Sequence, residues 1–187
     1  MGFTRAELDS FRDRTVPDLL PDPLRLLLVG INPGLISAAT GVHFARRGNR
    51  FYPALHLAGI TETVIDAGDG MSAADRAQLT DKGVGISNLC PRATARADEL
   101  DDAELRAGVA HLTEIVTERA PEVVAILGIT AFRTAFSRPK ATLGWQDSPW
   151  EGTALYVAPN PSGLNAHAQV PDHAAAYAEI ARAAGVI

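Results

Sequence analysis

Short apolar runs, each ended by glycine, proline or a polar loop, constrain the fold of this chain more than any other feature. The first run, residues 24–29, stops at the turn GINPG (30–34), where two glycines and a proline force an irregular backbone. Similar runs occupy residues 83–87, 122–128 and 154–158. Runs of this length, separated by helical segments, are typical of strands in a parallel sheet covered on both faces. The sequence therefore predicts an α/β fold, a three-layer α/β/α arrangement with a mostly parallel central sheet of four to five strands.

Helical segments are expected between these runs. In the clearest one, which begins at Asp101, the residues Leu105, Val109, Leu112 and Val116 recur at helical spacing and form one apolar stripe. Further helices are expected at 5–14, 50–59, 73–79, 129–137 and 172–184, while the rest of 60–82 and all of 138–152 are expected to be irregular. The length fits a single domain, 1–187, in which 1–23 form an N-terminal helix and a proline-marked connector.

The charge balance gives no simple sign of a nucleic-acid partner. Hydrophobic residues make up 47% and charged residues 21% of the chain, and the formal net charge is −5. A protein that touches a few phosphates needs only a local basic face, however. The arginines are unevenly placed, with Arg46, Arg47 and Arg50 in one loop and Arg92 and Arg96 in another.

Several classes of site are excluded by the motifs that the sequence lacks. Cys90 is the only cysteine, so intrachain disulfides and all-cysteine metal sites are excluded. The histidines show no metal-ligand spacing, and neither a phosphate-binding glycine motif after a strand nor the hydrolase pattern GxSxG occurs. No apolar run approaches the roughly 20 residues that span a bilayer. We therefore expect a protein of a reduced intracellular compartment, without a metal and without a membrane partner.

Three polar loops follow three of the predicted strands, with the sequences GINPG, SNLCPRAT and PNPSG. The carboxyl ends of parallel strands meet at one edge of a sheet, where ligands bind. Asn32, Asn88 and Asn160 are therefore expected to surround one cleft. The alternative is that asparagine and proline serve here only as common turn residues.

The same loops carry a resemblance to a known family. The segment GINPGLISAATGVHFARRGNRFYPALHLAGIT resembles the first motif region of the mismatch-specific uracil/thymine-DNA glycosylases. GVGISNLCPRATARADEL is similar to the middle motif of that family and PNPSGLNAH to its final motif, in the same order, between Leu24 and His167. The resemblance implies a single α/β/α domain that flips a damaged or mispaired base out of duplex DNA and cuts its N-glycosidic bond, without a metal or cofactor.

The resemblance also implies residue roles near the base. Asn32 matches the catalytic asparagine that positions the attacking water. Phe44 matches the aromatic residue that stacks on the extruded base, although a phenylalanine near a strand end can equally be part of the core. Backbone N–H groups around Ile31 and Phe44 would bind the carbonyl oxygens of the base. Asn88 occupies a variable polar position and either reads the edge of the base or assists the water.

Other matching residues are expected to contact the DNA. Gly163, Leu164 and Asn165 match the wedge that enters the gap left by the flipped base, and an apolar leucine suits such insertion. Phosphate and wedge contacts are also expected from Ser162, His167, Arg46, Arg47 and Arg92.

The sequence therefore favours a monofunctional DNA glycosylase acting on uracil opposite guanine, and it leaves open whether thymine or ethenocytosine is also a substrate. Lys82 and Lys140 are the only lysines, so the motif loops contain none to form a Schiff base. The expected partner is double-stranded DNA, and the protein is expected to be a cytoplasmic, nucleoid-associated monomer. Two alternatives stay open: a hydrolase of free nucleosides or nucleotides, and a non-catalytic module that binds DNA lesions.

Overall fold

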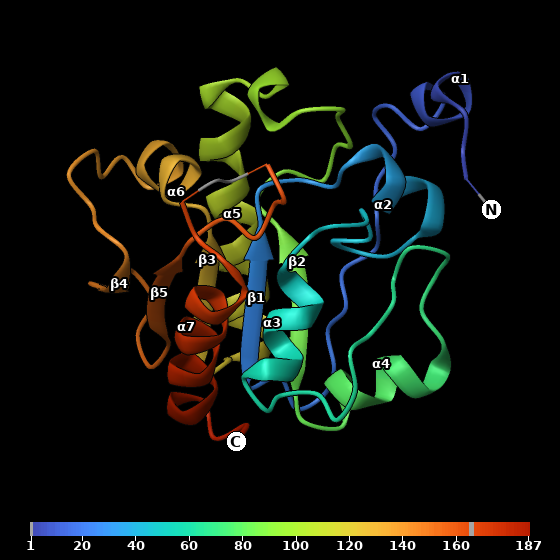
Figure 1. The fold of residues 1–187 in the computed structure, drawn as a ribbon. Coiled ribbons are helices and arrows are strands. Elements are labelled where there is room, and N and C mark those ends of the chain that lie inside the picture. Colours follow the sequence, from blue (N-terminus) through green and yellow to red (C-terminus); the bar gives the residue numbers. More distant parts are fainter. Residues whose placement is uncertain (1, 165–166) are drawn as a thin grey trace.

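A five-stranded sheet forms the centre of the protein, which we describe from a computed structural model covering residues 2–164 and 167–187 (Figure 1). All neighbouring strands pair in parallel except the last, which is an antiparallel edge strand. The order across the sheet is β2 (Val84–Asn88), β1 (Leu26–Gly30), β3 (Val123–Leu127), β5 (Ala154–Ala158) and β4 (Gly144–Gln146). The predicted α/β fold with a mostly parallel sheet is confirmed.

Each face of the sheet is covered by helices, because successive side chains of a strand point to opposite faces. Leu26 and Leu28 of β1 belong to one buried cluster, whereas Leu27 and Val29 belong to the other. The first cluster is completed by α3 (Phe51–Leu57) and α7 (Val170–Ala183), and the second by α5 (Asp102–Arg119) and α6 (Ile129–Ala135). In Figure 1, α3 and α7 lie side by side in front of the sheet.

Two short elements, α2 (Leu35–Thr40) and β4, are not among the helices and strands expected from the sequence. Helix α2 follows the GINPG turn directly, and it buries only Leu35 and Ser37. Strand β4 pairs with β5 alone, with Trp145 opposite Tyr156, and so depends on a partner that a local pattern does not reveal. The prediction that 138–152 is entirely irregular was therefore wrong at Gly144–Gln146.

The N-terminal helix is shorter than expected. Helix α1 (Arg5–Asp9) begins with a capping box between Thr4 and Glu7. After it the chain turns, Asp13 takes a positive φ of 60°, and its N–H donates to the carbonyl of Ala93 at 3.0 Å. The predicted helix over 5–14 was thus too long, because tertiary hydrogen bonds replace helical ones beyond the first turns.

The boundaries of other helices differ from those predicted from the sequence. Helix α4 (Ala73–Thr80) and the 3₁₀ turn η1 (Ala97–Glu99) lie in connections on either side of β2. Helix α7 begins at Val170 instead of residue 172, because Pro171 fits its first turn, where no N–H is needed. Within residues 2–164 and 167–187, no helix combines the length and the apolar character that crossing a membrane requires.

Candidate active site

A cavity of about 1040 Å³ lies at the carboxyl ends of the parallel strands. Asn32 and Asn160 follow β1 and β5, Asn88 ends β2, and all three line this cavity. The structure thus brings these three asparagines together around one cavity, as their positions at the ends of parallel strands predicted. The cavity is also lined by Ile31, Phe44, Arg46, Ser162, Leu164 and His167.

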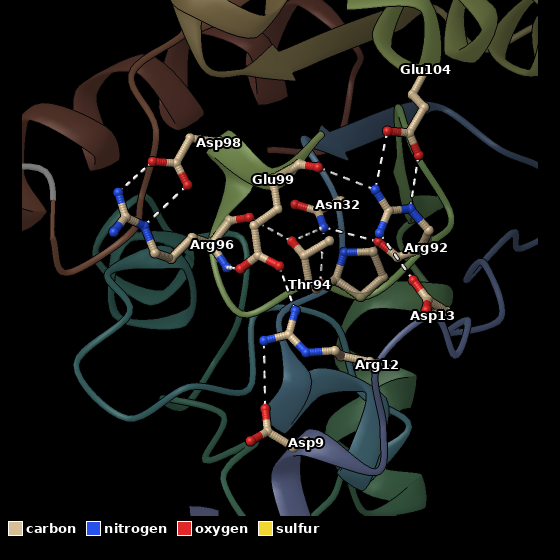
Figure 2. Close-up of polar contacts among 11 residues, drawn as sticks. Asp9, Arg12, Asp13, Asn32, Arg92, Thr94, Arg96, Asp98, Glu99 and Glu104 are labelled. Carbon is tan, nitrogen blue, oxygen red and sulfur yellow. Dashed lines mark hydrogen bonds and ion pairs between the residues drawn. The ribbon is translucent and has the colours of Figure 1, made fainter. Parts of the chain in front are cut away.

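The Asn32 amide is fixed through its nitrogen, whose two hydrogens are shared among three acceptors. Asn32 Nδ2 lies 2.9 Å from the Arg92 carbonyl oxygen, 3.2 Å from the Pro33 carbonyl oxygen and 2.8 Å from Thr94 Oγ1. Carbonyl oxygens only accept, so these partners determine which end of the amide is nitrogen. Asn32 Oδ1 points away from all three, as Figure 2 shows, and accepts no hydrogen bond from any described residue. A fixed acceptor is therefore left on a residue that lines the cavity.

Thr94 completes the support of Asn32. It is 1% exposed, and its hydroxyl donates to the Arg96 carbonyl at 2.7 Å while accepting from Asn32. The Thr94 N–H also donates to the Pro33 carbonyl at 3.2 Å. The loop after β2 and the turn after β1 are therefore held together as one unit.

Arg92, predicted to contact phosphate, is bonded instead to neighbouring carboxylates (Figure 2). Its Nε and Nη2 donate to the two carboxylate oxygens of Glu104 at 2.8 and 3.1 Å, and its Nη1 donates to Asp13 Oδ1 at 2.9 Å. The guanidinium lowers the pKa of Glu104 to about 2, and these carboxylates raise the pKa of Arg92. An ion pair between Arg12 and Glu99 joins the same network. The side chain thus holds the loop whose carbonyl supports Asn32, and its contact with phosphate stays a prediction.

Asn88 is 6% exposed and is held by a histidine that sequence reasoning did not single out. Asn88 Nδ2 lies 2.9 Å from His43 Nδ1, and His43 Nε2 lies 2.9 Å from the Pro17 carbonyl oxygen. Burial lowers the pKa of His43. A Cβ on Gly30 would lie 2.5 Å from Asn88 Oδ1 and 2.9 Å from Phe44 Cζ, so a larger residue at position 30 would displace one of these side chains.

Phe44 is partly buried and lines the cavity beside Asn88. Its ring stacks on Phe51 with centroids 4.0 Å apart and an interplanar angle of 23°, so only its other face and its edges can meet a ligand. Phe44 has a positive φ of 56°, which is strained for a residue with a side chain. One face of the ring is therefore packed against Phe51, and stacking of an extruded base on the other face stays a prediction.

The PNPSG loop presents Leu164 to solvent. Leu164 is 73% exposed, and the loop before it is anchored by Arg50, whose Nη1 donates to the Ser162 carbonyl at 2.8 Å. A Cβ on Gly163 would lie 2.6 Å from the Gly48 carbonyl oxygen, so this glycine permits close contact between the loops. Asn165, part of the predicted wedge, lies outside the described residues.

Two of the three remaining residues predicted to contact phosphate line the cavity. Arg46 and His167 line the cavity, whereas the Arg47 side chain is 79% exposed with Nη2 3.8 Å from Asp69 Oδ2. Within residues 2–164 and 167–187, no group of three histidine, cysteine or acidic residues is arranged to hold a metal ion. Burial raises the pKa of the Cys90 thiol to about 11, so this residue is neutral and poorly nucleophilic.

Sequence reasoning missed three residues of the site, namely His43, Thr94 and Leu143. His43 and Thr94 act through partners distant in the sequence, such as the Pro17 carbonyl and Asn32. Leu143 is 50% exposed and lines the cavity from the segment before β4. No local pattern in the sequence marks any of these contacts.

The sequence of residues 17–182 matches the uracil DNA glycosylase superfamily. The chain belongs to this superfamily. A solution NMR structure from Methanosarcina acetivorans, described as a candidate uracil DNA glycosylase, has a similar fold, with a TM-score of 0.58. The two chains are 16% identical, and the similarity covers 90% of this chain and 98% of the other. At this identity the comparison with the solved structure shows the fold alone.

Proposed function

We propose that this protein is a monofunctional DNA glycosylase that removes uracil, and also thymine or ethenocytosine, opposite guanine in duplex DNA. The observation that carries the proposal is the fixed Asn32 amide, whose Oδ1 is left without a partner among the described residues, on the wall of the cavity. Membership of the uracil DNA glycosylase superfamily supports both the reaction and DNA as the partner.

Asn32 Oδ1 accepts a hydrogen bond from water and orients it toward the anomeric carbon. As the glycosidic bond breaks, the sugar becomes oxocarbenium-like and the base leaves as an anion. An amide is a poor base, so the rate depends on holding the water in place and on stabilising the leaving base. In the complete reaction the water molecule adds its hydroxyl group to the anomeric carbon, and its other proton is taken up by the departing base.

The base enters the cavity by flipping out of the duplex. Phe44 offers one ring face for stacking, because the other face lies on Phe51. Leu164, exposed at the end of the PNPSG loop, inserts into the gap that the base leaves. Backbone N–H groups near Ile31 and Phe44 bind the carbonyl oxygens of the base, and Arg46, Arg47 and His167 contact phosphates.

The proposal is tested by base release from a labelled duplex with one G·U pair, detected as strand cleavage only after alkali treatment. The wild-type protein should give alkali-dependent cleavage, because hydrolysis without a Schiff base leaves an intact abasic strand. Cleavage without alkali would contradict the monofunctional assignment.

Two further assays separate the alternatives. Free deoxyuridine should not be hydrolysed, and hydrolysis of it that is unchanged in Leu164→Ala would instead support a nucleoside hydrolase. Leu164→Ala should lose more activity on G·U, which is hydrogen-bonded, than on uracil opposite an abasic site. Binding of mismatched duplex without release of uracil, thymine or ethenocytosine would support the non-catalytic module.

A further inference from the structure

His43 is a buried histidine, 5% exposed, with both ring nitrogens in hydrogen bonds. Its Nε2 faces the Pro17 carbonyl at 2.9 Å, and a carbonyl oxygen can only accept, so Nε2 carries a hydrogen. In a neutral imidazole the other nitrogen is then an acceptor. Burial favours this neutral form by lowering the pKa of His43. The Pro17 carbonyl therefore selects one tautomer of the ring.

This tautomer determines which way the Asn88 amide points. His43 Nδ1 accepts, so the Asn88 atom 2.9 Å from it is the donor Nδ2. Asn88 Oδ1 is consequently turned toward Gly30 and Phe44, because a Cβ added at Gly30 would lie 2.5 Å from Oδ1 and 2.9 Å from Phe44 Cζ. Asn88 and Phe44 both line the cavity, and Oδ1 accepts no hydrogen bond from any described residue. The site thus presents an acceptor beside the proposed stacking ring.

We propose that His43 is a positioning residue that fixes the polarity of Asn88, so that the site prefers extruded bases carrying an N–H at the edge facing Asn88 Oδ1. This inference rests on the proposed function and assigns the role of Asn88 in it to reading the base. Uracil and thymine carry a hydrogen on N3. In 3,N4-ethenocytosine that edge is closed by the etheno ring and has no N–H, so the acceptor favours uracil over the adduct.

The direct test measures affinity instead of chemistry. Duplexes carry 2′-fluoroarabino-uridine or its ethenocytidine counterpart opposite guanine, because fluorine destabilises a cationic sugar and keeps the glycosidic bond intact. The measured quantity is the ratio of the two dissociation constants. It is compared between wild type, His43→Ala, His43→Gln and the control His56→Ala, in which an exposed histidine of α3 is removed.

The two variants of His43 are expected to separate. In His43→Ala nothing selects the orientation of the Asn88 amide, and the preference for uracil should fall roughly tenfold, the value of about one hydrogen bond left unmade. Glutamine can donate to the Pro17 carbonyl from nitrogen and accept from Asn88 at oxygen, so His43→Gln should keep the preference. The loop should persist in both, because the buried hydroxyl of Tyr52 donates to the His43 carbonyl at 2.8 Å.

A pH profile adds a readout that a merely structural role would not change. Protonation gives Nδ1 a hydrogen, so Asn88 must turn Oδ1 to it and present its amide nitrogen to the base. The wild-type preference for uracil should therefore decline as pH falls through the pKa of His43, and that of His43→Gln should not. The groups around the ring are Asp18 of the connector, which raises this pKa, Arg76 of α4, which lowers it, and uncharged Tyr52 and Asn88.

Three results would overturn the inference. They are an unchanged preference in His43→Ala, a loss of preference in His43→Gln as large as that in His43→Ala, and absence of selective binding by the wild type. Failure of the proposed function would look different, since uracil would not be released from an ordinary G·U duplex whatever the binding ratio.

Discussion

Asn32 and Asn88 are the same side chain at the ends of neighbouring strands, yet they are held in different ways. Each amide donates from its nitrogen, each oxygen accepts no hydrogen bond from a described residue, and both residues line the cavity. Asn32 is held by two carbonyl oxygens and a hydroxyl, which do not titrate near neutral pH. Asn88 is held by the ring of His43, which does. The first amide should therefore keep its orientation over a wide pH range, and the second should lose it in acid.

The difference also separates two tasks. In the proposed function, the water at Asn32 must be positioned for any base that enters the cavity, and the support of Asn32 is built from two backbone carbonyl oxygens and the Thr94 hydroxyl. The base edge facing Asn88 differs from substrate to substrate, and a single side-chain partner decides which edge is preferred. We infer that variation at position 43 changes selectivity, whereas variation around Asn32 changes the rate for all bases alike.

Among the residues that support Asn32, replacing Thr94 should reduce the rate of base release most. Thr94→Val keeps the shape but removes the acceptor for Asn32 Nδ2, and the release rate should fall by about a hundredfold, as for small displacements of catalytic groups. Thr94→Ser retains the hydroxyl and should stay close to wild type. Single-turnover rates on G·U and G·ethenocytosine check this, and a loss confined to one substrate would break the proposed division of tasks.

A smaller effect on the support of Asn32 is expected when Arg92 is replaced. Removing it in Arg92→Ala frees the loop from Glu104 and Asp13, and the rate should fall by about fivefold, since partly exposed ion pairs contribute little. Duplex affinity and its dependence on salt should change little. Arg47→Ala is the matched comparison, because loss of a phosphate contact should weaken the salt dependence. A reduced salt dependence in Arg92→Ala would support the phosphate contact that the sequence predicts.

The smallest expected effect concerns acid stability. His173 of α7 is fully buried, neither ring nitrogen has a partner among the described residues, and burial lowers its pKa. The unfolded chain therefore binds protons first as pH falls, so stability decreases from just above the ordinary pKa of about 6.5 down to the lowered folded value. His173→Leu should stabilise the protein by about 1 kcal/mol and reduce this loss.

Denaturant unfolding at several pH values measures the effect. His173→Leu also helps to compare Asn32 with Asn88. It reduces acid unfolding, so that changes in base preference at low pH can be assigned to protonation of His43. An unchanged slope of stability against pH in His173→Leu would show that His173 does not contribute, and the remaining slope would then belong to His43 and other groups.

The sheet and the meeting of its polar loops could be predicted from the sequence, because both depend on local signals. An apolar run followed by glycine, proline and asparagine marks a strand and its carboxyl end, and parallel strands bring such ends together. Helix α2 and strand β4 could not be predicted, since one is short with little burial and the other depends on pairing with β5.

The positions of Asn32 and Asn88 could be predicted, but their orientations could not. Orientation is set by Thr94 and Arg92, about sixty positions beyond Asn32, and by His43 and Pro17, before Asn88 in the chain. These partners meet only through the tertiary fold. The same applies to the ion pairs of Arg92 with Asp13 and Glu104, which the sequence did not indicate.

The most direct test of the account is the single-turnover rate of uracil release from a G·U duplex by Asn32→Ala beside wild type, with duplex affinity measured for both. The account predicts a loss of roughly 10² to 10³ in rate, as when one positioned catalytic group is removed, with affinity nearly unchanged. Uracil release by Asn32→Ala at the wild-type rate would contradict the assignment of the water to Asn32.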